Sequence, residues 1–169
     1  MIFIGIGANL PSPECGEPVD TCRASLDRLE AEGVAVVRRS RWYRSQPVPA
    51  SDQPWFVNGV AELATSLAPE PLFEVMRRIE ERFGRVRTGV ANEARVLDLD
   101  LLAHGATVTG PNAAVQVPHP RLHERAFVLR PLVELAPEWR HPALGRTAAE
   151  LLAAVGGDQV AEPLEPGTG

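Results

Sequence analysis

The chain has 169 residues, 44% hydrophobic and 23% charged, which is an ordinary composition for a globular domain. A net charge of −5 argues against a general nucleic-acid binder, and we expect neither a membrane span nor a signal peptide because no apolar run is long enough. All 17 basic residues are arginine, which excludes a lysine-dependent phosphate loop such as GxxxxGK[ST]. We therefore expect a cytoplasmic protein, in which Cys15 and Cys22 are reduced thiols.

The first half of the chain predicts alternating strands and helices. Apolar residues alternate in the expected strands and recur at helical spacing in the expected helix, which Gly33 closes. The motif Gly7-Ala8-Asn9-Leu10 predicts a turn after the first strand. The predicted elements are a strand over 2–6, a helix over 19–32, a strand over 34–38, an irregular segment over 39–53 and a strand over 56–67.

The second half continues this alternation. Its predicted elements are a helix over 69–83, a surface loop over 85–94, an acidic strand over 95–104, a turn over 105–111, a short strand over 115–117, and helices over 124–135 and 147–155. The order βαββαβ predicts an α+β sandwich with helices on one face of a mainly antiparallel sheet. We expect a single domain over 1–158 and a flexible C-terminal tail over 159–169.

The most informative segment is the acidic strand, Arg95-Val96-Leu97-Asp98-Leu99-Asp100-Leu101-Leu102. Its period of two places Asp98 and Asp100 on one face and the alternate leucines on the other. Two unpaired carboxylates about 4 Å apart would repel by roughly 4 kcal/mol at an effective dielectric near 20. A cation such as Mg²⁺, which takes one or two carboxylates together with phosphates, would relieve this repulsion. The octapeptide alone is equally consistent with a strand that has one solvated face.

Three other segments bear on this choice. Arg85 and Arg87 flank the end of a helix, 117–127 holds two histidines and two arginines among prolines, and 53–58 combines aromatic and amide side chains. Taken singly, a solvated helix end or a core aromatic explains each of them. Together with the acidic pair they indicate a metal-dependent phosphoryl transferase that acts on nucleotides and whose second substrate is planar.

The sequence resembles the 6-hydroxymethyl-7,8-dihydropterin pyrophosphokinase (HPPK) family of folate biosynthesis. The resemblance begins at the motif Ile4-Gly5-Ile6-Gly7-Ala8-Asn9-Leu10 and extends to about Pro137. Its strongest marks are the acidic strand and the segment 117–129. The resemblance implies a ferredoxin-like α+β fold and an enzyme that transfers diphosphate from ATP to the pterin hydroxymethyl group and releases AMP.

The resemblance also implies a set of residues that act on ATP. Asp98 and Asp100 would bind two Mg²⁺ ions that bridge the ATP phosphates and the attacking hydroxyl. Arg85, Arg87 and Arg95 would be the arginines around a catalytic loop. Arg125 would contact the triphosphate, His119 would bind phosphate, and Glu80 would be a carboxylate of the nucleotide site.

A second implied set binds the pterin. The Asn58 amide would form hydrogen bonds with the edge of the pterin ring, and the backbone at Ser45 and Val48 would complete these contacts. Phe56 and Phe127 would stack on the two faces of the ring. We expect a monomer whose ligands are ATP and the pterin, with no nucleic-acid or membrane partner.

The chain departs from the family pattern at three places. Asn92 stands where some members have a tryptophan that closes over the pterin, Pro120 replaces a tyrosine, and the loop over 11–18 is long. Two alternative functions remain on the same fold. An inactive pterin- or nucleotide-binding regulator would have no need of the acidic pair, and a metal-dependent nucleotide hydrolase would have no need of the patch of aromatic and amide residues.

Overall fold

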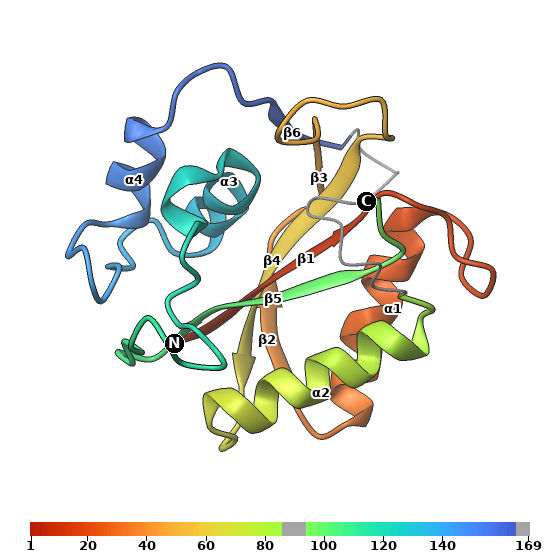
Figure 1. Cartoon of the computed structure of the whole chain (residues 1–169), viewed down its shortest axis with the longest axis horizontal. Coiled ribbons are helices and arrows are strands. Elements are labelled where there is room, and N and C mark those ends of the chain that lie inside the picture. Colours follow the sequence, from red (N-terminus) through yellow and green to blue (C-terminus); the bar gives the residue numbers. More distant parts are fainter. Residues whose placement is uncertain (86–93, 165–169) are drawn as a thin grey trace.

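The computed structural model describes residues 1–85 and 94–164. In these ranges the chain forms a six-stranded sheet whose strand pairings are all antiparallel. The strands are β1 (Ile2–Ala8), β2 (Ala35–Arg39), β3 (Tyr43–Ser45), β4 (Phe56–Ala64), β5 (Asp98–His104) and β6 (Ala161–Pro163). Their order is β5-β1-β4-β3-β6, and β2 also pairs with β4, with the opposite end of that strand from β3 (Figure 1). The predicted α+β class with an antiparallel sheet is confirmed.

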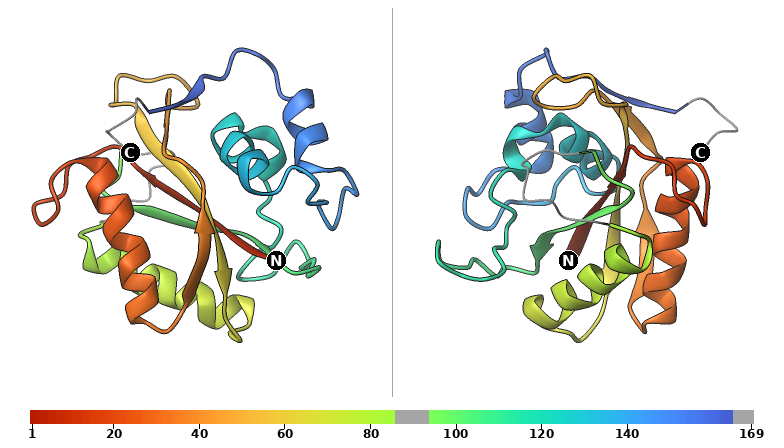
Figure 2. Two further views of the ribbon diagram at one scale, coloured as in Figure 1. Left: turned by 180° about the vertical axis from the view of Figure 1, so that it is seen from behind. Right: turned by 45° about the vertical axis from the view of Figure 1, so that its right-hand side comes forward.

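Helices cover both faces of this sheet. The α-helices of the described ranges are α1 (Pro18–Ala31), α2 (Pro69–Arg82), α3 (Ala126–Leu135) and α4 (Ala148–Ala154). The first two pack on one face and the last two on the other (Figure 2). Our prediction that one face alone is covered is wrong, because β1 is apolar on both sides. Ile4 and Ile6 join the cluster beneath α1 and α2, while Phe3 joins the cluster beneath α3 and α4.

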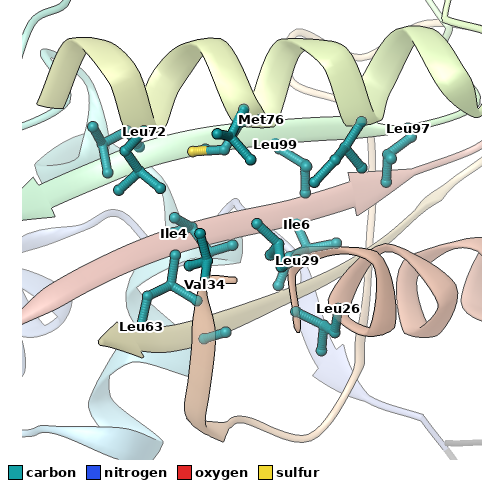
Figure 3. Packing of buried hydrophobic residues seen from close by; sticks show 14 of the residues in the cluster. Ile4, Ile6, Leu26, Leu29, Val34, Leu63, Leu72, Met76, Leu97 and Leu99 are labelled. Carbon is teal, nitrogen blue, oxygen red and sulfur yellow. The ribbon is translucent and has the colours of Figure 1, made fainter. Parts of the chain in front are cut away.

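The apolar face of the acidic strand is buried as its alternation predicted. Leu97, Leu99 and Leu101 are each at most 3% exposed and belong to the cluster with α1 and α2. Figure 3 shows Leu97 and Leu99 beneath α2, beside Met76 of that helix. Asp98 and Asp100 consequently face the opposite side of the sheet, where α3 begins.

Several element boundaries differ from the predictions. The segment 39–53 contains the three-residue β3, which is too short to give a periodic signal. Residues 115–117 form no strand, although Val115 and Val117 are buried. A short 3₁₀ helix, η1 (Leu122–Glu124), precedes α3, and the expected tail contributes β6. No helix of the described ranges is long and apolar enough to span a membrane.

Candidate active site

One pocket lies between the ends of β1, β4 and β5 and the start of α3. It brings together nine of the residues implied by the resemblance: Ser45, Val48, Phe56, Asn58, Arg95, Asp98, Asp100, Arg125 and Phe127. Its other lining residues are Gly5, Ile6, Gly7, Gln46, Pro47, Gln53, Gly59 and Val128. Residues 86–93, which include the predicted Arg87 and the departure at Asn92, lie outside the described ranges.

The central strand β1 forms the floor of this pocket. Gly7 pairs with Asn58 on one side and with Asp98 on the other, while Gly5 pairs with Asp100. A Cβ atom at Gly7 would lie only 2.9 Å from Asn58 Nδ2, so a glycine keeps the floor open. Because neighbouring strands are about 4.8 Å apart, the backbones of Asn58 and Asp98 are separated by roughly 10 Å. This width allows two ligands to lie side by side.

Asp98 is held by two arginines. Arg85 Nη1 donates to Asp98 Oδ1 at 2.7 Å, and Arg95 Nη1 lies 3.1 Å from Asp98 Oδ2. Burial acts to raise the pKa of Asp98, but the charges of Arg95 and Arg85 outweigh it and keep this pKa below its ordinary value. Two arginines of the chain thus supply part of the positive charge that the acidic pair needs.

Asp100 has a different electrostatic environment. Burial, followed by the negative charge of Asp98, raises the pKa of Asp100 from 3.8 to about 8, although Arg125 opposes this shift. Ionisation of both carboxylates is therefore unfavourable while no further positive charge is present, and an added cation would favour the ionised form of Asp100. Within the described ranges no group of three or more His, Cys, Asp or Glu side chains could hold a metal ion. A cation at the pair would draw its remaining ligands from water and phosphate, as Mg²⁺ commonly does.

Glu80 lies behind the pocket wall. The residue is 2% exposed, and its Oε2 accepts a hydrogen bond from the Leu99 backbone N–H at 2.8 Å. The same oxygen lies 3.5 Å from Arg85 Nη1, which also donates to the Leu97 carbonyl at 3.2 Å. Arg85 Nε has no acceptor among the described residues. Glu80 and Arg85 therefore support Asp98 from the interior, and neither residue lines the pocket.

Arg125 lies at the start of α3 and faces the acidic pair from across the pocket. Its guanidinium carbon lies 5.4 Å from the centre of the Phe127 ring. Burial and then the charge of Arg121 lower its pKa, while Asp100 and Asp98 act to raise it, so the Arg125 site is adapted to a negatively charged partner.

His119 lines a neighbouring hollow with His123 and His141 and does not line the pocket itself. Its Nδ1 accepts the backbone N–H of Arg121 at 3.1 Å. Burial, followed by the charge of Arg125, lowers the pKa of His119 from 6.5 to about 4. The ring is therefore neutral at pH 7, and its proton is on Nε2 because Nδ1 is the acceptor.

The opposite half of the pocket combines an amide with two aromatic rings. Asn58 is 7% exposed, and its Oδ1 accepts a hydrogen bond from the hydroxyl of Ser45, which fixes the orientation of the amide. Phe56 on β4 and Phe127 on α3 both line this half. The Arg95 guanidinium carbon lies 5.9 Å from the centre of the Phe56 ring, so Arg95 stands between the two halves.

Asn9 is a supporting residue that the sequence analysis placed only in a turn. Its Oδ1 accepts the backbone N–H of Arg95 at 2.8 Å. Its Nδ2 donates to Gln53 Oε1 at 2.8 Å and to the Pro54 carbonyl at 2.9 Å. Asn9 is 2% exposed and thus joins the segment that carries Arg95 to the segment that leads to Phe56. The available signal was its place at the end of a glycine-containing strand motif.

Comparison with known proteins identifies a family and relatives of this chain. The model of the family described as 7,8-dihydro-6-hydroxymethylpterin-pyrophosphokinase (HPPK) matches residues 3–137. The 2-amino-4-hydroxy-6-hydroxymethyldihydropteridine pyrophosphokinase of Pseudomonas aeruginosa is 42% identical over 154 residues, which cover 90% of each chain. The enzyme of the same name from Synechocystis is 36% identical over 150 residues, or 88% of this chain and 73% of that protein.

A longer fungal relative also matches. The folic acid synthesis protein fol1 of Pneumocystis carinii is 32% identical over 148 residues, which are 88% of this chain but 19% of that protein. The bacterial relatives, in contrast, are covered over most of their length. The family model matches most of the length of this chain, and the pocket holds nine of the expected residues. The chain therefore belongs to the HPPK family.

Proposed function

We propose that the pocket performs the family's reaction with the pterin over its Asn58 half and the ATP phosphates over its Asp98 half. The chain is a pyrophosphokinase of folate biosynthesis, so its substrates are ATP and 6-hydroxymethyl-7,8-dihydropterin. The hydroxymethyl oxygen forms a bond to the β-phosphorus of ATP, the bond from that phosphorus to the AMP oxygen breaks, and AMP leaves. The observation that carries this assignment is one pocket that acidic and arginine side chains line together with an amide and two aromatic rings.

The pterin half selects a flat ligand with a hydrogen-bonding edge. The side chains of Phe56 and Phe127 provide apolar faces for the ring, and the amide of Asn58, oriented by Ser45, pairs with the ring edge. The backbone at Ser45 and Val48 completes these contacts. The hydroxymethyl group then points across Gly7 toward the phosphates.

In the phosphate half, arginines neutralise the transferred group. Arg95 and Arg125 line the pocket and bind phosphate oxygens, and Arg85 holds Asp98 in place from behind. His119 donates from Nε2 to the nucleotide at the edge of the site. Arg87, which lies outside the described ranges, is assigned to the phosphates on the family resemblance. We assign Glu80 a positioning role toward Arg85 and the Leu99 backbone in place of a direct contact with the nucleotide.

Asp98 and Asp100 are the residues that would hold Mg²⁺, two ions when ATP is bound. These two residues fit such a site, because both line the pocket and Mg²⁺ commonly binds one or two carboxylates together with substrate phosphates. When bound, Mg²⁺ would neutralise phosphate charge and orient the triphosphate for transfer. We also propose that the chain acts as a cytoplasmic monomer.

The test is to incubate the protein with ATP and Mg²⁺, with and without the reduced hydroxymethylpterin, and to measure AMP. We expect AMP only when the pterin is present, in equal amount to the pterin diphosphate. AMP formation without pterin would indicate hydrolysis, and binding of both ligands without turnover would indicate an inactive regulator. Either result would overturn the assignment. Measuring the same reaction with EDTA tests the need for Mg²⁺.

A further inference from the structure

The C-terminal segment 159–164 lies outside residues 3–137, which the family model matches, yet it returns to the pocket. Its strand β6 pairs antiparallel with β3, which carries Ser45 (Figure 1). The backbone N–H of Gln46, another lining residue, donates to the carbonyl of Val160 at 3.3 Å. The segment therefore supports the pterin half of the pocket from its outer edge.

The side chain of Gln159, in the same segment, contacts the opposite wall. Its Nε2 donates to the carbonyl of Glu124 at 2.8 Å, and its Oε1 accepts the backbone N–H of Ala126 at 3.0 Å. Arg125 is the one residue between these two positions, and it lines the pocket. A single carboxamide thus fixes both peptide groups that flank Arg125.

The junction at Arg125 depends on this contact. Arg125 is the N-cap of α3 with an extended backbone (φ −116°, ψ 111°), and its own side chain makes no capping hydrogen bond. The first N–H groups of a helix have no acceptor within the helix, so they need one from elsewhere. Gln159 supplies that acceptor to Ala126, the first residue of α3. The orientation of the Arg125 side chain therefore depends on Gln159, which lies 34 positions away in the sequence.

We propose that Gln159 is a positioning residue for Arg125, which it directs into the pocket opposite Asp98 and Asp100. This inference rests on the proposed function, in which Arg125 contacts the triphosphate. A misplacement of about 1 Å in a reacting group can lower a rate about 100-fold. Loss of both hydrogen bonds at the junction should therefore lower kcat/KM for ATP by about 10- to 100-fold.

The test compares Gln159→Met, Arg125→Met and the double variant. Methionine keeps the length of the side chain and removes both hydrogen bonds. Each variant is assayed for kcat, for KM with ATP, for the Kd of the pterin alone and for Tm. The matched control is Glu162→Gln, which removes an ion pair with Arg44 whose side chains are 54% and 50% exposed. We expect the control to stay within about twofold of the parent, as an exposed pair contributes little.

Two comparisons decide the result. If Gln159 acts only through Arg125, Gln159→Met should cause little further loss of kcat/KM for ATP in the Arg125→Met background. The Kd for the pterin should not change in either background. An equal loss in both backgrounds, or no loss in the parent, overturns the inference. If Arg125→Met itself leaves kcat and KM for ATP unchanged, the role proposed for Arg125 fails instead.

If Gln159→Met does not fold, the same cycle is run with Gln159→Glu. Glutamate keeps the acceptor for the Ala126 N–H and loses the donor to the Glu124 carbonyl. The same two comparisons then support or overturn the inference, and here too the loss should vanish in the Arg125→Met background.

Discussion

Replacing Asp100 by asparagine should stabilise the metal-free protein at neutral pH while it abolishes turnover. The pKa of Asp100 is raised from 3.8 to about 8, so between these values the folded chain holds a proton that the unfolded chain has released. The free energy of unfolding therefore falls as pH rises through this window, by about 1.4 kcal/mol per pH unit. At pH 7 the loss is on the order of 4 kcal/mol, which Asp100→Asn should restore.

Asp98 provides the control, because its pKa is shifted in the opposite direction from that of Asp100. The pKa of Asp98 is held below its ordinary value once the charges of Arg95 and Arg85 outweigh burial. Its contribution to stability is present above pH 3.8 and is lost as pH falls through the lowered pKa. Asp98→Asn removes the charge that pairs with Arg85 and Arg95, so it should destabilise the fold by about 3 kcal/mol at pH 7.

The assay is urea-induced unfolding in EDTA at several pH values between about 4 and 8. Asp100→Asn should gain stability over the parent progressively as pH rises, and the gain should disappear near the ordinary carboxyl pKa of 3.8. A parent and an Asp100→Asn variant with the same pH dependence would refute the reasoning. So would equal shifts in stability for the two asparagine variants, since the structure gives the two carboxylates different partners.

Three further predictions concern single side chains. Asn58→Ala should weaken pterin binding by about 1–3 kcal/mol in calorimetry and leave ATP binding unchanged, whereas equal weakening of both ligands would make Asn58 structural. Arg95→Ala should lower kcat by about 100- to 1000-fold with a smaller effect on KM for ATP, and the reverse pattern in steady-state kinetics would contradict a transition-state role. Glu80→Gln keeps an oxygen for the Leu99 N–H but removes the charge near Arg85, so it should lower Tm without changing the Kd for the pterin.

The sequence predicted those features of the site that depend on local periodicity or on motifs. Alternation in the acidic strand placed Asp98 and Asp100 together and the leucines in the core, as the structure confirms. The resemblance indicated Asn58 and Phe127, which come from β4 and α3 and meet across one pocket. The sequence placed the glycines of β1 in an apolar strand but did not predict that they form the pocket floor. That role follows from the register of β1 with β4 and β5.

Features that depend on contacts between distant segments were not predicted. The three residues of β3 lack a periodic signal, and β6 has no apolar run that distinguishes it from a tail. β3 becomes a strand because it pairs with β4 and β6, and β6 because it pairs with β3. The placement of helices on both faces follows from β1, whose Phe3 and Ile4 point to opposite sides. Periodicity within one strand does not reveal which elements cover each face.

The asymmetry of the acidic pair has the same origin and bears directly on function. Arg85 reaches Asp98 from just beyond the end of α2, and Arg95 reaches it from the same chain three residues earlier. No arginine pairs as closely with Asp100 within the described ranges, and burial followed by the charge of Asp98 raises its pKa to about 8. If the pair holds a cation as we propose, Asp98 would be ionised and oriented before the ligands bind, whereas Asp100 would release its proton when the cation enters the pocket. Because a cation must displace that proton, its binding to the pair should become tighter as pH rises toward 8.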